Sequence, residues 1–146
     1  MDTTERNKQL FRKLITEVIN PGRLDLADKY LTADRPDYQE LGMPPELTKG
    51  PEGFRRTVGM FREAFPDLTF TSEWMIAEGD KVLSYNRIEG THRNPFMGAP
   101  PTGKRFVAYA ADICSFDADG KISAHWGVFD MVSAMIQLGL MPAPRG

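Results

Sequence analysis

The sequence contains a single cysteine and no long apolar run. Cys114 has no second cysteine to pair with, so we expect a small buried strand residue in a fold that packing alone holds together, as in the reducing cytoplasm. No apolar stretch approaches the roughly 18 residues that a membrane span requires, and the N-terminus lacks a basic and apolar signal pattern. We therefore expect a cytoplasmic protein without a membrane partner.

An excess of basic residues is also absent. The chain has 18 Lys and Arg residues against 20 Asp and Glu residues, a net charge of −2, and the basic residues are scattered along it. A surface that binds nucleic acid needs clustered positive charge that neutralises several phosphates. We therefore expect no nucleic-acid partner. The length of 146 residues suits a single domain over residues 1–146.

Signatures of metal and cofactor sites are missing as well. The two histidines, His92 and His125, lie too far apart in the sequence for a zinc signature. The segment Pro101-Thr102-Gly103-Lys104 lacks the leading glycine of a phosphate-binding loop, and Cys-x-x-Cys does not occur. The Gly-x-Ser-x-Gly motif of a serine nucleophile is absent too. We therefore expect no metal site, no phosphate-binding loop and no serine nucleophile of this kind.

The hydrophobic pattern changes its period about halfway along the chain. Apolar residues first recur at helical spacing, and β-branched and aromatic residues then dominate between turn signals. Thr3 or Thr4 can cap the first helix, and Asp130 can cap the last. The predicted helices cover residues 3–19, 23–31, 51–64 and 131–138, and a loop rich in proline and glycine covers residues 32–49. The predicted strands cover residues 68–76, 82–92, 105–116 and 121–129.

This order of elements predicts the fold class. Helices followed by successive strands indicate an α+β fold, in which the helices pack on one face of an antiparallel meander. A strongly curved sheet leaves a gap between its concave face and the helices. We therefore expect a cone-like α+β barrel that encloses one apolar pocket.

Asp112 and His125 are expected to meet across the last hairpin. If the tight turn centres on Ala118 and Asp119, the register places Asp112 directly opposite His125, within hydrogen-bonding reach. Such a pair can act as a general acid or base with an orienting partner. The alternatives are a structural hydrogen bond or two outward-facing polar residues. Trp126 would then point to the opposite face, in the core or in a subunit contact.

Other residues are weaker candidates for the site. His92 ends a predicted strand, where it can be an acid, a base or an oxyanion donor at the pocket rim, or a structural residue. Asp130 has the same ambiguity, because a helix cap is its alternative role. The candidate substrate-binding residues are Trp74, Phe96, Met97, Tyr38 and Asp130.

Several short strings stand in a shared order that covers most of the chain. They are Phe65-Pro66-Asp67-Leu68, Glu78-Gly79-Asp80-Lys81-Val82, Gly90-Thr91-His92, Pro100-Pro101-Thr102-Gly103-Lys104, Asp119-Gly120-Lys121-Ile122 with His125-Trp126 and Asp130, and Gln137-Leu138-Gly139. Together they resemble the SnoaL-like polyketide cyclase (ester cyclase) family of the nuclear transport factor 2-like superfamily. The resemblance implies a helix-capped curved sheet, a homodimer or homotetramer formed through sheet faces, and no cofactor.

The resemblance also implies an activity and its residues. Family members close polyketide rings by intramolecular aldol condensation, using an acidic residue in an apolar pocket. His92 matches the family's strand-end histidine, and His125 begins its His-Trp pair. The anthracycline ring cyclases carry an aspartate two residues beyond that second histidine, where this chain has Gly127, while Asp112 falls at the position of their other histidine.

The expected function is therefore that of a cofactor-independent cyclase acting on a small apolar, polyketide-type substrate. Its catalytic residues would be Asp112, His125 and His92. One alternative is a non-catalytic module that binds small molecules or dimerises. Another is a hydroxylase or an epoxide-opening enzyme, which would combine Asp112 with Arg87 and Glu73 if all three side chains point inward.

Overall fold

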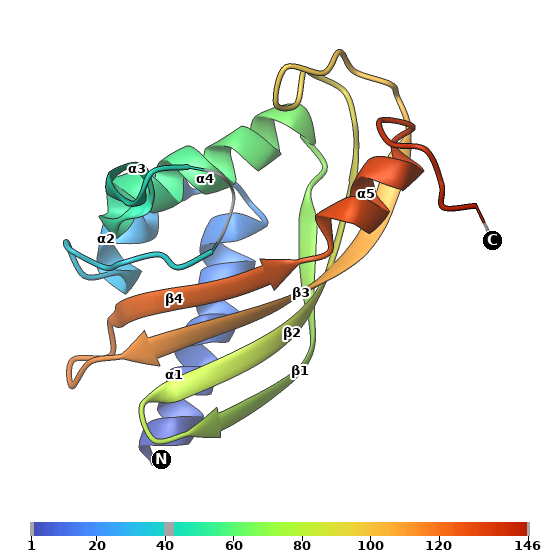
Figure 1. Cartoon of the computed structure of the whole chain (residues 1–146). Coiled ribbons are helices and arrows are strands. Elements are labelled where there is room, and N and C mark those ends of the chain that lie inside the picture. Colours follow the sequence, from blue (N-terminus) through green and yellow to red (C-terminus); the bar gives the residue numbers. More distant parts are fainter. Residues whose placement is uncertain (1, 40–42, 146) are drawn as a thin grey trace.

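The computed structural model describes residues 2–39 and 43–145. The predicted change from helices to strands is confirmed (Figure 1). The N-terminal helices are α1 (Thr3–Lys13), the π-helical turn η1 (Leu14–Ile19), the 3-10 turn η2 (Leu24–Leu26), α2 (Ala27–Tyr30), α3 (Pro45–Thr48) and α4 (Gly50–Ala64). The strands are β1 (Thr69–Glu78), β2 (Lys81–Thr91), β3 (Arg105–Phe116) and β4 (Ile122–Phe129), and they are followed by α5 (Met131–Gln137).

The ends of the outer helices follow from their capping residues. Asp2, rather than Thr3 or Thr4, caps α1, because its carboxylate accepts the N–H of Glu5. Asp130 caps α5 as predicted, by accepting the N–H of Ser133.

The sheet is an antiparallel meander in the order β1-β2-β3-β4. It is strongly curved but does not close, and α1 and α4 lie on its concave side (Figure 1). The α+β prediction is therefore confirmed. Beyond the edge of β4, Leu31 and Asp37 form parallel bridges to Ile122 and His125. These bridges place a segment of the predicted loop beside the sheet, next to the predicted site.

The turn between β3 and β4 is one residue longer than the predicted tight turn. Phe116 pairs with Ile122 rather than with Lys121. Gly120, with φ of +82°, closes the turn by donating its N–H to the carbonyl oxygen of Asp117. A bulge next to Phe116 then shifts the pairing by one further residue.

This shift corrects the predicted register. Asp112 pairs with Gly127, and Cys114 pairs with His125, so the predicted direct opposition of Asp112 and His125 is wrong. A shift by two residues nevertheless keeps every side chain on the same face of the sheet, because side chains alternate with a period of two. Asp112 and His125 are therefore diagonal neighbours on the concave face.

The core has two parts. One lies beneath α1 and η1, where Phe11 and Val18 pack against Val82 and Cys114 of the sheet. The other lies at the far end of the sheet, and it contains Phe65, Leu68, Phe96, Phe106 and Leu138.

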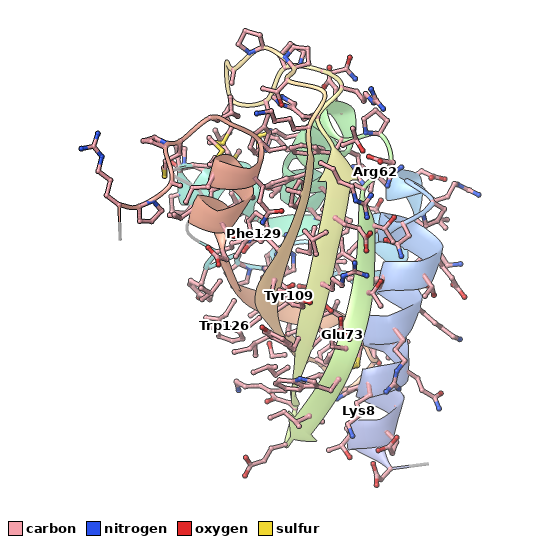
Figure 2. All side chains as sticks on the ribbon, turned by 90° about the vertical axis from the view of Figure 1, so that its right-hand side faces the viewer. Lys8, Arg62, Glu73, Tyr109, Trp126 and Phe129 are labelled. Atoms are coloured by element: carbon pink, nitrogen blue, oxygen red, sulfur yellow. The ribbon has the colours of Figure 1, made fainter. Side chains whose placement is uncertain are left out.

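The convex face of the sheet carries stacked aromatic side chains. Trp74 stacks on Tyr85 and Tyr85 on Tyr109, with ring centroids 5.1 and 5.4 Å apart. Figure 2 views this face, with Tyr109 near its centre. Trp126 also lies away from the cavity side and stacks on Tyr38. Self-association through sheet faces stays a prediction. Within the described ranges, no helix has the length and apolar character that crossing a bilayer requires.

Leu138 provides a test of the second part of the core. Its side chain is fully buried, so Leu138→Ala leaves a cavity and is expected to lower the free energy of unfolding by roughly 2–5 kcal/mol. Urea denaturation measures the change. The matched control is Leu47→Ala, at an exposed leucine, with an expected change within about 0.5 kcal/mol. Equal losses in the two variants would contradict the assigned packing.

Candidate active site

A cavity lies between the concave face of the sheet and the helices. The cavity has a volume of about 100 Å³. Its wall is mostly apolar, and polar residues interrupt it where β3, β4 and the segment after α2 meet. The apolar wall includes Leu14, Phe54, Phe61, Phe70, Ile88 and Phe129.

His125 is held between two carboxylates at this cavity. Its Nε2 lies 2.9 Å from Oδ1 of Asp112, and its Nδ1 lies 2.8 Å from Oδ1 of Asp37. The three side chains come from β4, β3 and the bridged segment, respectively. All three line the cavity. The backbone fixes this arrangement, because the N–H of Tyr38 donates to the carbonyl oxygen of His125 at 2.8 Å.

Further hydrogen bonds run from Asp112 across the sheet. Asn86 donates from Nδ2 to Oδ2 of Asp112 at 2.8 Å, and its own Oδ1 accepts the hydroxyl of Ser84 at 2.6 Å. The hydroxyl of Ser72 lies 2.8 Å from that of Ser84. A polar row thus runs from β1 to β4, and it fixes the carboxylate plane of Asp112.

Arg35 contacts Asp37, the second carboxylate that is bonded to His125. Its guanidinium is buried, with Nη1 lying 3.3 Å from Oδ2 of Asp37. Nη2 donates to the carbonyl oxygens of Thr48 and Gly50, at 3.1 and 3.0 Å. Arg35 therefore ties the segment after α2 to the start of α4.

The pKa values follow from these contacts. Burial alone would lower the pKa of His125, but the hydrogen bonds to Asp112 and Asp37 outweigh it and raise the pKa to about 9. Burial alone would raise the pKa of Asp37, but its hydrogen bond to the imidazolium keeps that pKa below the ordinary value. At neutral pH the imidazole is therefore protonated and donates from both nitrogens.

Gly127 leaves room for this pair. A Cβ atom at position 127 would lie 3.0 Å from Oδ1 of Asp112 and 3.0 Å from Cε1 of His125. Position 127 is where the anthracycline ring cyclases carry their acid. Because Asp112 and Gly127 are paired across the strands, a carboxylate from β3 occupies the space that a side chain on β4 would otherwise enter.

An open cleft adjoins the buried cavity. Gln39 and Phe129 line both spaces. Methionine and aromatic side chains dominate the walls of the cleft, among them Tyr38, Met97, Trp126, Met131, Met135 and Met141. The cleft is therefore mostly apolar, and it shares two of its lining residues with the cavity.

His92 lies away from the Asp112–His125 pair and lines neither space described above. It is fully buried, and its ring contacts Phe65 and Phe96. Its Nδ1 accepts the backbone N–H of Thr102 at 3.2 Å. This geometry fixes the loop before β3.

The candidate substrate-binding residues are spread over the molecule. Tyr38 and Met97 line the open cleft. Phe96 is buried among the aromatic rings of the core, and Trp74 lies on the convex face. Asp130 forms the cap of α5.

Two further candidates for the epoxide-opening alternative do not join the site. Arg87 pairs with Glu89, and the strand register places it on the convex face. Glu73 is exposed at the bulge between Ser72 and Trp74 (Figure 2). The inward arrangement that this alternative required of them is therefore wrong.

Sequence reasoning missed Asp37, Arg35 and Asn86. Asp37 and Arg35 lie in a segment without periodicity, so no pattern assigns them a face. Asn86 had a usable signal, because its alternation along β2 places it on the face of Ser84 and Ile88. In the described part of the chain, no group of three or more His, Cys, Asp or Glu residues has the arrangement to hold a metal ion.

Solved structures with a similar fold include three informative ones. IdmH, a candidate polyketide cyclase from Streptomyces antibioticus, is 28% identical over 91% of this chain and 98% of its own, with a TM-score of 0.78. AclR, a candidate hydroxylase from Streptomyces galilaeus, is 26% identical over 97% of this chain and 86% of its own, with a TM-score of 0.82. A candidate SnoaL-like polyketide cyclase from Jannaschia sp. CCS1 shares the fold at 22% identity, with a TM-score of 0.83 and 97% of each chain covered.

A search of curated proteins gave no match. The family comparison did, because the model of the SnoaL-like polyketide cyclases matches residues 9–138, from α1 to the end of α5. The chain therefore belongs to the SnoaL-like polyketide cyclase family.

Proposed function

We propose that this protein is a cofactor-independent enzyme that transfers a proton on a small apolar, polyketide-type carbonyl compound, and that its reaction is intramolecular aldol ring closure. The observation that carries the proposal is the Asp112 carboxylate, held by an imidazolium in the wall of an apolar cavity. Membership of the family and the likeness to IdmH support it.

Asp112 is the proton acceptor in this proposal. His125 cannot accept a proton at neutral pH, because its pKa of about 9 keeps it protonated. Asp112 accepts one hydrogen bond at Oδ1 from His125 and one at Oδ2 from Asn86. An ionised carboxylate has about four acceptor sites, so lone pairs remain for a substrate proton. His125 and Asn86 position the carboxylate.

The proposed reaction begins when Asp112 removes a proton from the carbon next to a carbonyl group. The electron pair of the C–H bond moves toward the carbonyl oxygen and gives an enolate. The enolate carbon attacks a second carbonyl group of the same molecule, which forms a C–C bond and an alkoxide. Asp112 returns the proton to the alkoxide, so the carboxylate is restored and no co-reactant is needed.

Asp37 and Arg35 keep the site electrically balanced. Two carboxylates, one imidazolium and one guanidinium sum to zero charge in a buried region. When Asp112 takes up the substrate proton, its negative charge moves to the enolate. The neighbouring imidazolium stays close to that charge, which is the electrostatic stabilisation that proton abstraction from carbon requires.

Removal of the proposed base is the direct test. The assay follows deuterium uptake from heavy water at the carbon next to the carbonyl of 2-tetralone, a small bicyclic ketone, by NMR. Asp112→Asn is expected to lower the protein-catalysed exchange rate by at least roughly 100-fold, because general base catalysis contributes about that much or more.

The matched control for this assay is Asp80→Asn, an exposed aspartate in the turn between β1 and β2. It should exchange at the wild-type rate. Exchange in Asp112→Asn equal to that of the control would remove Asp112 from the mechanism. Wild-type exchange equal to the protein-free rate, with 2-tetralone bound, would favour the non-catalytic binding module.

The pKa of His125 gives a pH-dependence. Its folded value of about 9 lies above the ordinary 6.5, so its contribution to stability is complete below the unfolded value and is lost as the pH rises through about 9. We expect the free energy of unfolding to fall by roughly 3 kcal/mol over this window. Urea denaturation at pH 6.5 and 9.5 measures the loss.

His125→Gln is the comparison, because it removes the titrating group and leaves the other basic and phenolic groups unchanged. Its stability should change much less over the same pH window. Proton NMR of the imidazole signals gives the pKa directly, and Asp112→Asn should lower it by removing one carboxylate. A His125 signal that titrates near pH 6.5 in the wild type would refute the charged bridge.

Epoxide opening is the second candidate reaction. The observation that favours it is the pair of carboxylates, Asp37 and Asp112, on either side of the His125 imidazolium. One carboxylate takes a proton from the attacking water, and the imidazolium donates a proton to the epoxide oxygen, so that a diol forms. The likeness to AclR also supports chemistry other than aldol closure. Incubation of 1,2-epoxy-1,2,3,4-tetrahydronaphthalene in ¹⁸O-labelled water should then give a diol with one labelled oxygen by mass spectrometry, and unchanged epoxide would reject this reaction.

A further inference from the structure

Two buried polar groups of the cavity wall have no partner among the described residues. They are the hydroxyl of Thr57 and the Nε–H of Arg35. Thr57 is 7% exposed and Arg35 is 1% exposed, and both residues line the cavity. Buried polar groups in native proteins nearly always have a hydrogen-bond partner. Each of these two groups therefore lacks the partner that a buried polar group normally has.

Thr57 is a polar residue on the mostly apolar side of α4 that faces the cavity. It belongs to the stripe of α4 that faces the cavity, between Phe54 and Phe61, which also line the cavity. Threonine hydroxyls in helices commonly bond to the carbonyl four residues earlier, but the Thr57 hydroxyl makes no hydrogen bond to any described residue. A valine would fill the same volume without this orphaned group. The hydroxyl is therefore not explained by packing.

The unpaired Nε–H of Arg35 indicates which kind of chemical group its missing partner carries. Its Nη1 forms an ion pair with Asp37, and its Nη2 donates to the carbonyls of Thr48 and Gly50. Its Nε has no hydrogen-bond partner among the described residues. A guanidinium N–H can only donate, while a hydroxyl can donate or accept. An acceptor oxygen is therefore the kind of partner to which either group can donate. The residue that carries Nε also carries a permanent positive charge, which favours an oxygen that gains negative charge.

We propose that Thr57 and Arg35 form a binding subsite for the carbonyl oxygen of a ketone ligand in the cavity. The apolar body of the ligand then packs against Phe54, Phe61 and the sheet. This inference rests on the proposed function, because it names the group that receives the electron pair when Asp112 takes the proton. The subsite predicts that the cavity binds a ketone more tightly than a hydrocarbon of the same shape.

A pair of ligands tests the subsite without any turnover. The probes are 2-tetralone and tetralin, which share a bicyclic frame and differ by the carbonyl oxygen, and NMR titration measures both dissociation constants. Wild-type protein should bind 2-tetralone more tightly than tetralin. Thr57→Val should weaken 2-tetralone binding by roughly threefold to tenfold, the loss of about one hydrogen bond, and leave tetralin binding unchanged.

Thr57→Ser is the matched control, because it keeps the hydroxyl and loses only a methyl group. It should keep the wild-type preference for the ketone. Thermal denaturation checks that both variants fold, and Thr57→Val should be at least as stable as wild type, since it removes an unpaired buried hydroxyl. A preference in Thr57→Val equal to that in Thr57→Ser, or no binding of 2-tetralone to the wild type, would overturn the proposal.

The design separates this inference from the proposed function. Asp112→Asn should lose deuterium exchange and keep its preference for 2-tetralone. If exchange in Asp112→Asn were normal while Thr57→Val lost the preference, the subsite would stand and the assigned base would fail. If Asp112→Asn lost exchange and Thr57→Val kept the preference, the base would stand and the subsite would fail.

Discussion

The imidazolium of His125, bonded at both nitrogens to a carboxylate, joins parts of the chain that are far apart in sequence. One carboxylate comes from β3 and the other from the segment that pairs with the free edge of β4. Arg35 extends the link to the start of α4, and Asn86 extends it to β2. The wall of the cavity depends on this row of bonds, because the same residues close the gap between sheet and helices.

Charge balance explains how the charged side chains around His125 can be buried together. A lone buried carboxylate would take up a proton, and a lone buried histidine would lose one. Here Asp112 and Asp37 keep His125 charged, and His125 and Arg35 keep Asp37 ionised. Removing one member leaves the others unbalanced, which costs far more than the net contribution of an intact pair. His125 and Asp37 therefore hold each other in their charged forms at the edge of the cavity.

Periodicity carries most of what the sequence predicts correctly. The order of helices and strands, the α+β class and the shared face of Asp112 and His125 all follow from spacing, and the pairing error did not change that face because it was an even number of residues. Asp37 and Arg35 were not predicted, because they reach the site through tertiary pairing of an irregular segment. The length of a turn and the presence of a bulge likewise depend on local backbone geometry, which residue types indicate only weakly.

The close approach of Asp112 to Gly127 bears on how relatives are compared. A Cβ atom at position 127, which pairs with Asp112 across the strands, would lie 3.0 Å from Oδ1 of that carboxylate. A side chain at position 127 and the carboxylate of Asp112 therefore compete for the same space. Relatives with a larger residue at position 127 are expected to differ at position 112 as well, so the two positions are best compared together.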